Sequence, residues 1–171
     1  KAPPIKTVTD LNGGSVLPND VLRYTVTVSN TGNDASANTI LTDAIPANTT
    51  YVPGSLQITS GANSGTKTDP AGDDQAEFTG TATRFRLGAG ANATVGGTIG
   101  INQSTTITFN VRVNAGVPAG TTISNQASVA YNGASLGTPF TSLSDGDPNT
   151  SGTQPTTVVV GSSQARLSIT K

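Results

Sequence analysis

The sequence predicts an all-β protein built as one antiparallel β-sandwich with long loops. Three observations point to this fold class. Val, Ile, Leu and Thr recur in alternating runs that suit half-buried strands, and Gly, Asn and Pro separate the runs as turn residues do. No stretch carries the periodicity of an amphipathic helix. The length of 171 residues allows one large domain or two small ones.

The individual strands are placed where alternating runs end at turn residues. In chain order they are expected at residues 3–10, 21–30, 38–45, 51–58, 77–87, 93–101, 105–113, 123–131 and 156–160. The first is expected at a sheet edge, because Pro3 and Pro4 have no amide hydrogen to donate. Residues 59–75 are expected to form a long loop of open role. Its acidic residues are expected to be a solvated patch: Asp69, Asp73 and Asp74.

The domain organisation is expected to be one sandwich over residues 1–160, followed by a linker and a protruding strand over residues 161–171. The last seven residues alternate, and one face would carry Leu167, Ile169 and Lys171. The final Ile-Thr-Lys is similar to the Pro-Ile-Lys of the opening strand. This segment is therefore expected either to start a further tandem repeat or to be donated to a neighbouring subunit.

Composition excludes several classes of partner and chemistry. Charged residues make up 11% of the chain and its net charge is −1, so neither nucleic acid nor an anionic membrane is expected as a partner. Cys and His are absent, which excludes nucleophile–imidazole pairs, zinc sites and redox motifs, and no enzyme acting on an external substrate is expected. No run is long enough for membrane insertion in this segment, and no signal peptide is visible at Lys1. A cysteine-free, Thr-rich composition favours an extracellular location, on a cell surface or in a secreted fibre.

Several short motifs together resemble a conserved repeat domain of large bacterial surface proteins that has no assigned function. They are LRYTVTVSNTG (22–32), LTDAIP (41–46), YVPGS (51–55), ISNQASV (123–129) and SDGDP (144–148) with PTT (155–157). The motifs follow in the expected order and span most of the chain. The resemblance implies an immunoglobulin-like sandwich that occurs in tandem arrays in adhesins and envelope proteins. The insert at residues 59–75 departs from the compact pattern of that family.

Three polar residues fall on strand faces that are otherwise apolar: Lys6, Asp43 and Asn125. Burial lowers the pKa of a Lys amine and raises the pKa of an Asp carboxyl, which gives a neutral nucleophile beside a neutral acid. Lys6 would then attack the Asn125 carboxamide, and Asp43 would shuttle the proton while an amide cross-link forms. This set is similar to the autocatalytic isopeptide bonds of Gram-positive pilin and adhesin sandwiches.

Structural roles are equally open to the same three residues. Asn125 would cap backbone groups at a bulge, Asp43 would hold the turn before Pro46, and Lys6 would be an ordinary edge-strand charge. Lys171, like Lys6, falls on the face of its predicted strand that carries apolar residues. If the last strand pairs with another molecule, Lys171 is therefore the alternative lysine, and the link would be intermolecular.

One stretch carries oxygen ligands at alternate positions, as calcium loops do: Asp145, Asp147 and Asn149. A loop of Asx-turns is the simpler interpretation. No cofactor is expected, and calcium is the one candidate that this stretch leaves open.

The function that the sequence favours is a structural repeat or subunit of an extracellular bacterial filament or adhesin stalk. Its partners would be copies of itself, arranged head to tail or as tandem repeats, and the cross-link would harden each unit. The alternative is a surface module that binds a glycan or a protein through its long loops. Aromatic residues, which form the platforms of sugar sites, make up only 4% of the chain.

Overall fold

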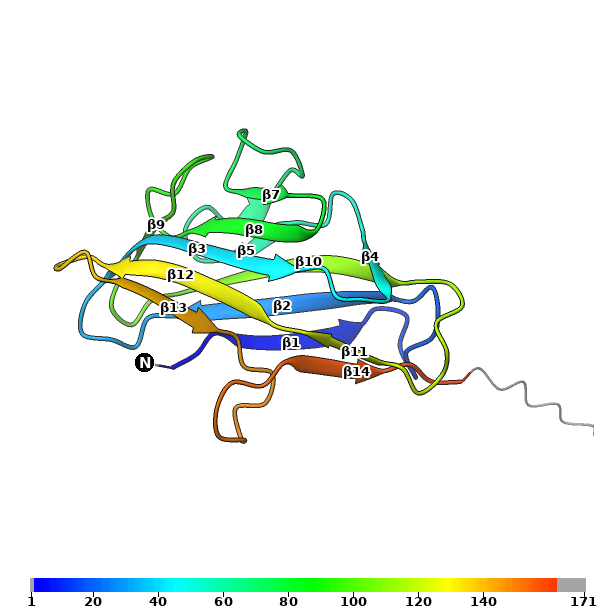
Figure 1. The fold of residues 1–171 in the computed structure, drawn as a ribbon. Coiled ribbons are helices and arrows are strands. Elements are labelled where there is room, and N and C mark those ends of the chain that lie inside the picture. The colour runs from blue at the N-terminus through cyan, green and yellow to red at the C-terminus, as the bar shows by residue number, and fades with distance from the viewer. Residues whose placement is uncertain (1, 163–171) are drawn as a thin grey trace, which may run out of the picture.

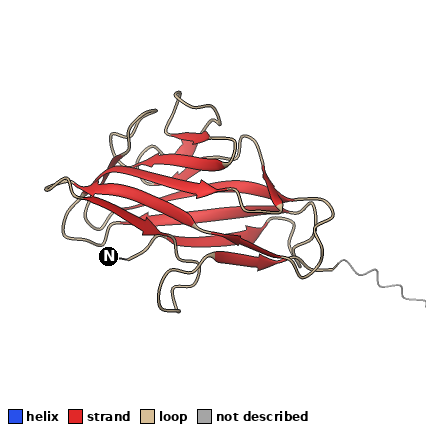
Figure 2. Cartoon of the chain, in the orientation of Figure 1, coloured by secondary structure: helices blue, strands red, loops and turns tan. Residues whose placement is uncertain are grey.

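The computed structural model describes residues 2–162 and shows two antiparallel sheets packed face to face (Figures 1 and 2). The first sheet has the order β1 (Ile5–Asp10), β2 (Val21–Ser29), β10 (Ser104–Val113), β5 (Gln57–Ser60), β6 (Gly65–Thr66), and β4 (Thr49–Tyr51) also pairs with β10. The second has the order β13 (Pro139–Leu143), β12 (Ala127–Gly133), β3 (Ser36–Ala44), β8 (Ala82–Leu87), β7 (Ala76–Phe78), and β9 (Gly97–Ile99) also pairs with β3. No helix occurs among these residues, so the predicted all-β sandwich is confirmed.

The core lies between the two sheets and follows the predicted alternation. On β2, every second residue from Leu22 to Val28 is buried, and β10 buries Ile107 and Phe109 against it. The second sheet contributes Leu41 and other apolar residues from β8 and β12. Each such side chain contributes roughly 1.5–3 kcal/mol by leaving water.

The predicted strand at 123–131 is divided in two by Gln126. Its first part, β11 (Thr122–Asn125), leaves the second sheet and pairs with β14 (Thr156–Val159), while β12 continues along β3. Gln126 donates from Nε2 to the Ser144 carbonyl oxygen at 2.9 Å, and the Ala127 amide donates to Ser144 Oγ at 2.9 Å. Partners distant in sequence therefore bend the chain here, and alternation alone does not predict the break.

Two other strands differ from their predictions because of glycines. The run 77–87 is a hairpin of β7 and β8, since Gly80 takes a φ of 92° in the turn between them. The run 93–101 is reduced to β9. There, the backbone of Gly96 lies against Asn38 and Thr39 so closely that a Cβ atom would approach them to 2.5 Å.

The long segment 59–75 is held to the sandwich by hydrogen bonds. Asp69 accepts from the Tyr51 hydroxyl at 2.6 Å and from the Gly54 amide at 2.8 Å, so the prediction of a merely solvated side chain is wrong for this residue. The Tyr51 ring stacks on Phe78 with 4.2 Å between centroids. Asp73 is exposed and bonds only within the segment, through Thr68 and the next amide.

Candidate functional site

Lys6 and Asp43 come from opposite sheets and meet inside the sandwich. Lys6 lies on the edge strand β1, and Asp43 lies on β3 in the middle of the second sheet. Both side chains have 0% exposure. Strand alternation turns each of them inward, as the sequence indicated, because neighbouring residues on a strand point to opposite faces.

The two charges form a tight, bidentate contact. Lys6 Nζ lies 2.7 Å from Asp43 Oδ1 and 2.6 Å from Asp43 Oδ2. Taking both charges out of water is costly, and the attraction between them only partly offsets that cost. A buried pair of this kind is therefore weak evidence for added stability and stronger evidence for a chemical role.

Burial shifts both members of the pair toward their neutral forms. Desolvation lowers the pKa of Lys6 from 10.5 to about 8, although the charge and hydrogen bonds of Asp43 oppose this fall. Desolvation likewise raises the pKa of Asp43 above its usual value, against the influence of Lys6 and of the nearby Asn125 amide. A proton passed from Lys6 to Asp43 would leave an amine next to a carboxylic acid.

Two aromatic rings line the Lys6 amine on the core side. Its Nζ atom lies 4.6 Å from the centroid of Tyr24 and 5.9 Å from that of Phe109, and the two rings stack at 5.5 Å. The rings exclude water from the amine and interact with its charge through their faces. Burial and the Asp43 charge raise the pKa of Tyr24, so its hydroxyl stays protonated.

Asn125 lies on β11 beside the pair and is 5% exposed. Its Nδ2 atom is buried, lies near enough to Asp43 to lower the pKa of that residue, and forms no well-directed hydrogen bond within residues 2–162. Thr156 connects Asn125 to β1, because it is the cross-strand partner of Asn125 and its hydroxyl donates to the Lys6 carbonyl oxygen at 3.0 Å. All three predicted residues are thus buried in one part of the core.

A polar loop fixes the position of Lys6 along the sandwich. The Lys6 amide donates to the Asp145 carbonyl oxygen at 2.8 Å, and the Asp145 amide donates to the Pro4 carbonyl oxygen at 2.7 Å. The Asp145 carboxylate accepts from the amides of Asp147 and Gln154. Sequence reasoning missed this role, since main-chain contacts leave no residue signature.

The candidate calcium residues are occupied by their own loop. Asp147 accepts from the Asn149 amide at 3.2 Å and the Thr150 hydroxyl at 2.7 Å, which lowers its pKa. Within residues 2–162, no three acidic side chains gather in the manner of a metal site. Calcium binding by Asp145, Asp147 and Asn149 stays a prediction. The alternative lysine, Lys171, lies outside the described residues.

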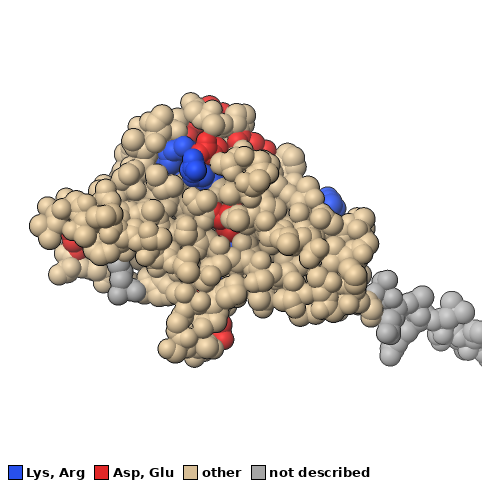
Figure 3. All heavy atoms as spheres, in the orientation of Figure 1, with Lys and Arg blue, Asp and Glu red and all other residues tan. Residues whose placement is uncertain are grey.

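Charged side chains gather elsewhere, over β7 and β8 (Figure 3). Glu77 is buried and accepts from Arg84 and Arg86, each at 3.0 Å. The rest of the face shown carries little charge. These three side chains form an ion-pair network across the β7–β8 hairpin. Within the described residues, none of them is hydrogen-bonded to Lys6, Asp43 or Asn125.

Membrane insertion was not expected from the sequence. Within the described range, no helix has the length and hydropathy that a membrane span requires.

No family model and no curated protein matches the chain, so the repeat family suggested by the motifs stays an expectation. Solved structures do match. A D312A variant of BcpA, the major pilin subunit of Bacillus cereus, has a TM-score of 0.58 at 13% identity, and the match covers 92% of this chain and 40% of the pilin. The collagen-binding domain of a Staphylococcus aureus adhesin has a TM-score of 0.50 at 12% identity, over 84% of this chain and 97% of that domain.

These similarities confirm the immunoglobulin-like antiparallel sandwich and the predicted resemblance to pilin and adhesin domains. The chain spans less than half the length of the matched pilin. The fold also occurs in AvmM, which catalyses macrocyclization in alchivemycin A biosynthesis, with a TM-score of 0.55 at 11% identity over 98% of this chain and 94% of that one. The fold by itself therefore does not separate a structural protein from an enzyme.

Proposed function

We propose that the chain is a structural unit of an extracellular bacterial filament or adhesin stalk, and that an isopeptide bond between Lys6 and Asn125 hardens it. The contact of Lys6 with Asp43 is the observation that carries this proposal. Both side chains are fully buried, Lys6 Nζ lies 2.6–2.7 Å from the two carboxylate oxygens of Asp43, and the Asn125 carboxamide lies near that carboxylate. The shared sandwich fold of pilin and adhesin domains supports the surface role.

The reaction begins with proton transfer from the Lys6 ammonium to Asp43. The neutral Nζ attacks Cγ of Asn125, and the Asp43 carboxylic acid donates a hydrogen bond to the oxygen that becomes negative. Asp43 then gives this proton to the leaving nitrogen and takes the second proton of Nζ. The Cγ–Nδ2 bond breaks, ammonia leaves, and a Nζ–Cγ amide remains, so one ammonia is lost for each bond formed.

Intact mass measurement tests the cross-link directly. The unmodified chain should be about 17 Da lighter than its calculated mass, which corresponds to one ammonia. Variants Asn125→Ala and Asp43→Ala should each have their full calculated mass, because one lacks the electrophile and the other the proton shuttle. Asn149→Ala, which changes an exposed Asn, should still lose ammonia. An unmodified chain at full mass would contradict the proposal.

The lysine in this reaction is Lys6 rather than Lys171, because Lys6 already contacts the Asp43 of its own chain. A protease digest should therefore contain one peptide pair joined through Lys6 and Asn125. An intermolecular bond through Lys171 would instead give a ladder of bands that survives boiling in detergent.

Assembly is proposed to be end to end, with copies of the chain as partners. The alternative, a glycan- or protein-binding module, has one feature in its favour: Phe140 is 44% exposed and lines a cavity together with Asp34. Tyr51 is buried and bonded to Asp69, so it offers no platform for a sugar.

A further inference from the structure

We propose that the outer edge of β13 and the apolar cavity beside it are the docking surface for residues 165–171 of a second copy. This inference rests on the proposed end-to-end assembly and names the surface that receives the partner. The segment would add one strand to the second sheet, next to β13, and close the seam between the two sheets.

The outer edge of β13 is uncharged and partly apolar. β13 pairs with β12 on one side, and no strand within residues 2–162 pairs with its other side. None of its five residues is charged, and Phe140 and Leu143 are 44% and 45% exposed. Edge strands of stable monomers usually carry charges, bulges or a covering loop, so an uncharged, apolar edge is suited to pairing.

The edge of the other sheet at the same seam is protected. β1 begins after Pro3 and Pro4, and the amide of Lys6 is already bonded to the Asp145 carbonyl oxygen. Apart from Pro139, which has no amide hydrogen, the outer side of β13 is paired with no described strand, whereas the start of β1 is already bonded to Asp145.

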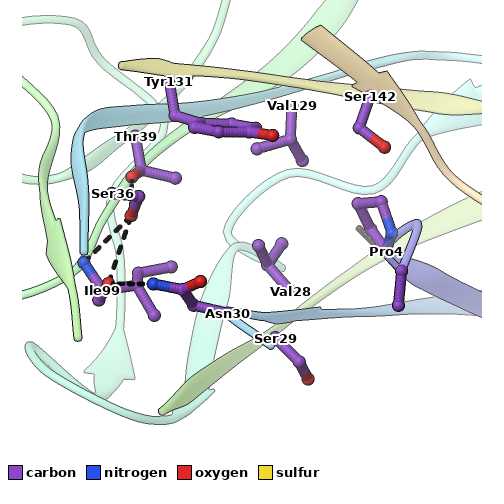
Figure 4. A pocket seen from close by; sticks show the side chains of 11 residues that line it. Pro4, Val28, Ser29, Asn30, Ser36, Thr39, Ile99, Val129, Tyr131 and Ser142 are labelled. Atoms are coloured by element: carbon purple, nitrogen blue, oxygen red, sulfur yellow. Dashed lines mark hydrogen bonds between the residues drawn. The ribbon is translucent and has the colours of Figure 1, made fainter. Parts of the chain in front are cut away.

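A cavity opens between the sheets at this seam (Figure 4). Its volume is about 30 Å³, which leaves space for a methyl group or two. Its lining is largely apolar, with Pro4 and Val28 from the first sheet's side, Val129 and Tyr131 from β12, and Ser142 from β13. A side chain placed over it would bury these groups from water.

A second cavity of about 490 Å³ adjoins the first, and Ala2 lines both. Leu136, which is 86% exposed, and Phe140 line it. The exposed apolar side chains at this end of the sandwich thus extend from the β12–β13 turn along the β13 edge.

The sequence of residues 165–171 suits a strand that covers this cavity. Residues 165–171 alternate, with Leu167 and Ile169 on one face and Ser168 and Thr170 on the other. In a strand beside β13, one face would point into the sandwich and the other to solvent. Leu167 and Ile169 would then cover the cavity, while backbone hydrogen bonds to β13 would supply the affinity, as in other cases of strand addition.

The described chain ends at Ser162, at the end of the sandwich opposite to residue 2 and to this cavity (Figure 1). The following segment of one copy therefore begins far from its own docking surface. When two copies are placed end to end, the segment of one copy begins beside the docking surface of the other. This geometry favours docking between copies over docking within one.

Cysteine pairing tests the contact, because the chain contains no Cys of its own. Ser142→Cys and Ile169→Cys chains are mixed and oxidised, and the mixed disulfide dimer is measured. Ser142 faces the cavity, and its neighbour Thr141 faces away, so Thr141→Cys is the matched control. The Ser142→Cys mixture should form about tenfold or more mixed dimer than the control. Equal amounts from both would overturn the proposal.

Charge insertion tests the orientation of the segment. The L167D/I169D variant places two carboxylates on the face that would cover the cavity and should shift the full chain to monomer in sedimentation velocity. The S168D/T170D variant adds the same charge on the opposite face and should keep the association of the unmodified chain. Loss of association in both variants, or in neither, would contradict the docking mode, as would an unmodified chain that stays monomeric at all concentrations.

The mass measurement separates this proposal from the cross-link. A monomeric chain that is lighter by one ammonia would overturn the docking surface and leave the isopeptide bond intact. An associated chain at full mass, with the expected cysteine pairing, would overturn the bond and support the docking surface.

Discussion

Burial gives the Lys6–Asp43 pair its chemical character at the scale of single residues. A surface pair at the same distance would remain charged, and the contact would contribute little. Here desolvation brings the pKa of the lysine down to about 8 and raises the pKa of the acid, so proton transfer between them requires less free energy than it would in water. The aromatic rings of Tyr24 and Phe109 maintain this state by excluding water.

The pH dependence of stability should reveal the lowered pKa of Lys6 once the cross-link is removed by Asn125→Ala. The folded chain releases the Lys6 proton near pH 8, whereas the unfolded chain holds it up to about pH 10.5. Between these values the unfolded state binds more protons, so the free energy of unfolding should rise with pH. Urea unfolding at several pH values measures this slope.

The matched control carries Lys6→Met in the same Asn125→Ala background, which removes the titrating amine and keeps a side chain of similar length. Its free energy of unfolding should lack the rise that Lys6 contributes between about pH 8 and 10.5. Identical slopes in the two proteins would show that the pKa of Lys6 is not lowered.

The three candidate residues were predictable from sequence because a strand repeats every two residues. Lys6, Asp43 and Asn125 each share parity with apolar neighbours, and this parity alone places them inside. The hydroxyl of Thr156 and the backbone of Asp145, which position Lys6, were not predictable. Asp145 lies between β13 and β14 and Thr156 begins β14, both far from Lys6 along the chain, and their residue types are ordinary for any loop or edge strand.

Some strands were likewise predictable from alternation, and others were not. Alternation predicted β2 and β10 nearly to their ends, since both bury every second residue. It missed β13, because four of its five residues are exposed and no alternation results. Alternation also did not predict the break between β11 and β12, because this break depends on a hydrogen bond from Gln126 to Ser144, 18 residues further along the chain.

The segment 59–75 should lose its attachment to the sandwich when Asp69 is replaced by Ala. The change removes two hydrogen bonds and leaves the half-buried hydroxyl of Tyr51 without its acceptor. Unfolding in urea, followed by circular dichroism, should show a loss of about 1–3 kcal/mol.

Asp73→Ala is the control for this change, because Asp73 is exposed and bonds only within the segment. Its effect should stay within about 0.5 kcal/mol. Equal losses for the two variants would indicate that Asp69 does not anchor the segment.

At the scale of the whole molecule, the cross-link would close a loop of more than a hundred residues between β1 and β11. By analogy with disulfide loops, this contributes about 5 kcal/mol to the free energy of unfolding. The melting temperature of Asn125→Ala should therefore fall by roughly 10–20 °C in calorimetry.

Asn149→Ala should melt within a few degrees of the unmodified chain, because Asn149 is exposed and lies outside the core. If Asn125→Ala behaves in the same way, the buried carboxamide has a packing role only.

The adjacency of β1 and β14 has a mechanical consequence. The two strands run in the same direction, and Thr156 joins them at Lys6, while the chain enters at one end of the sandwich and leaves at the other (Figure 1). A pull on both ends therefore shears β1 against its neighbours, so that the bonds along the strand resist together and do not open one at a time. With Lys6 bonded to Asn125, tension would pass from β1 straight into β11, and the 118 residues between them would bear none of it.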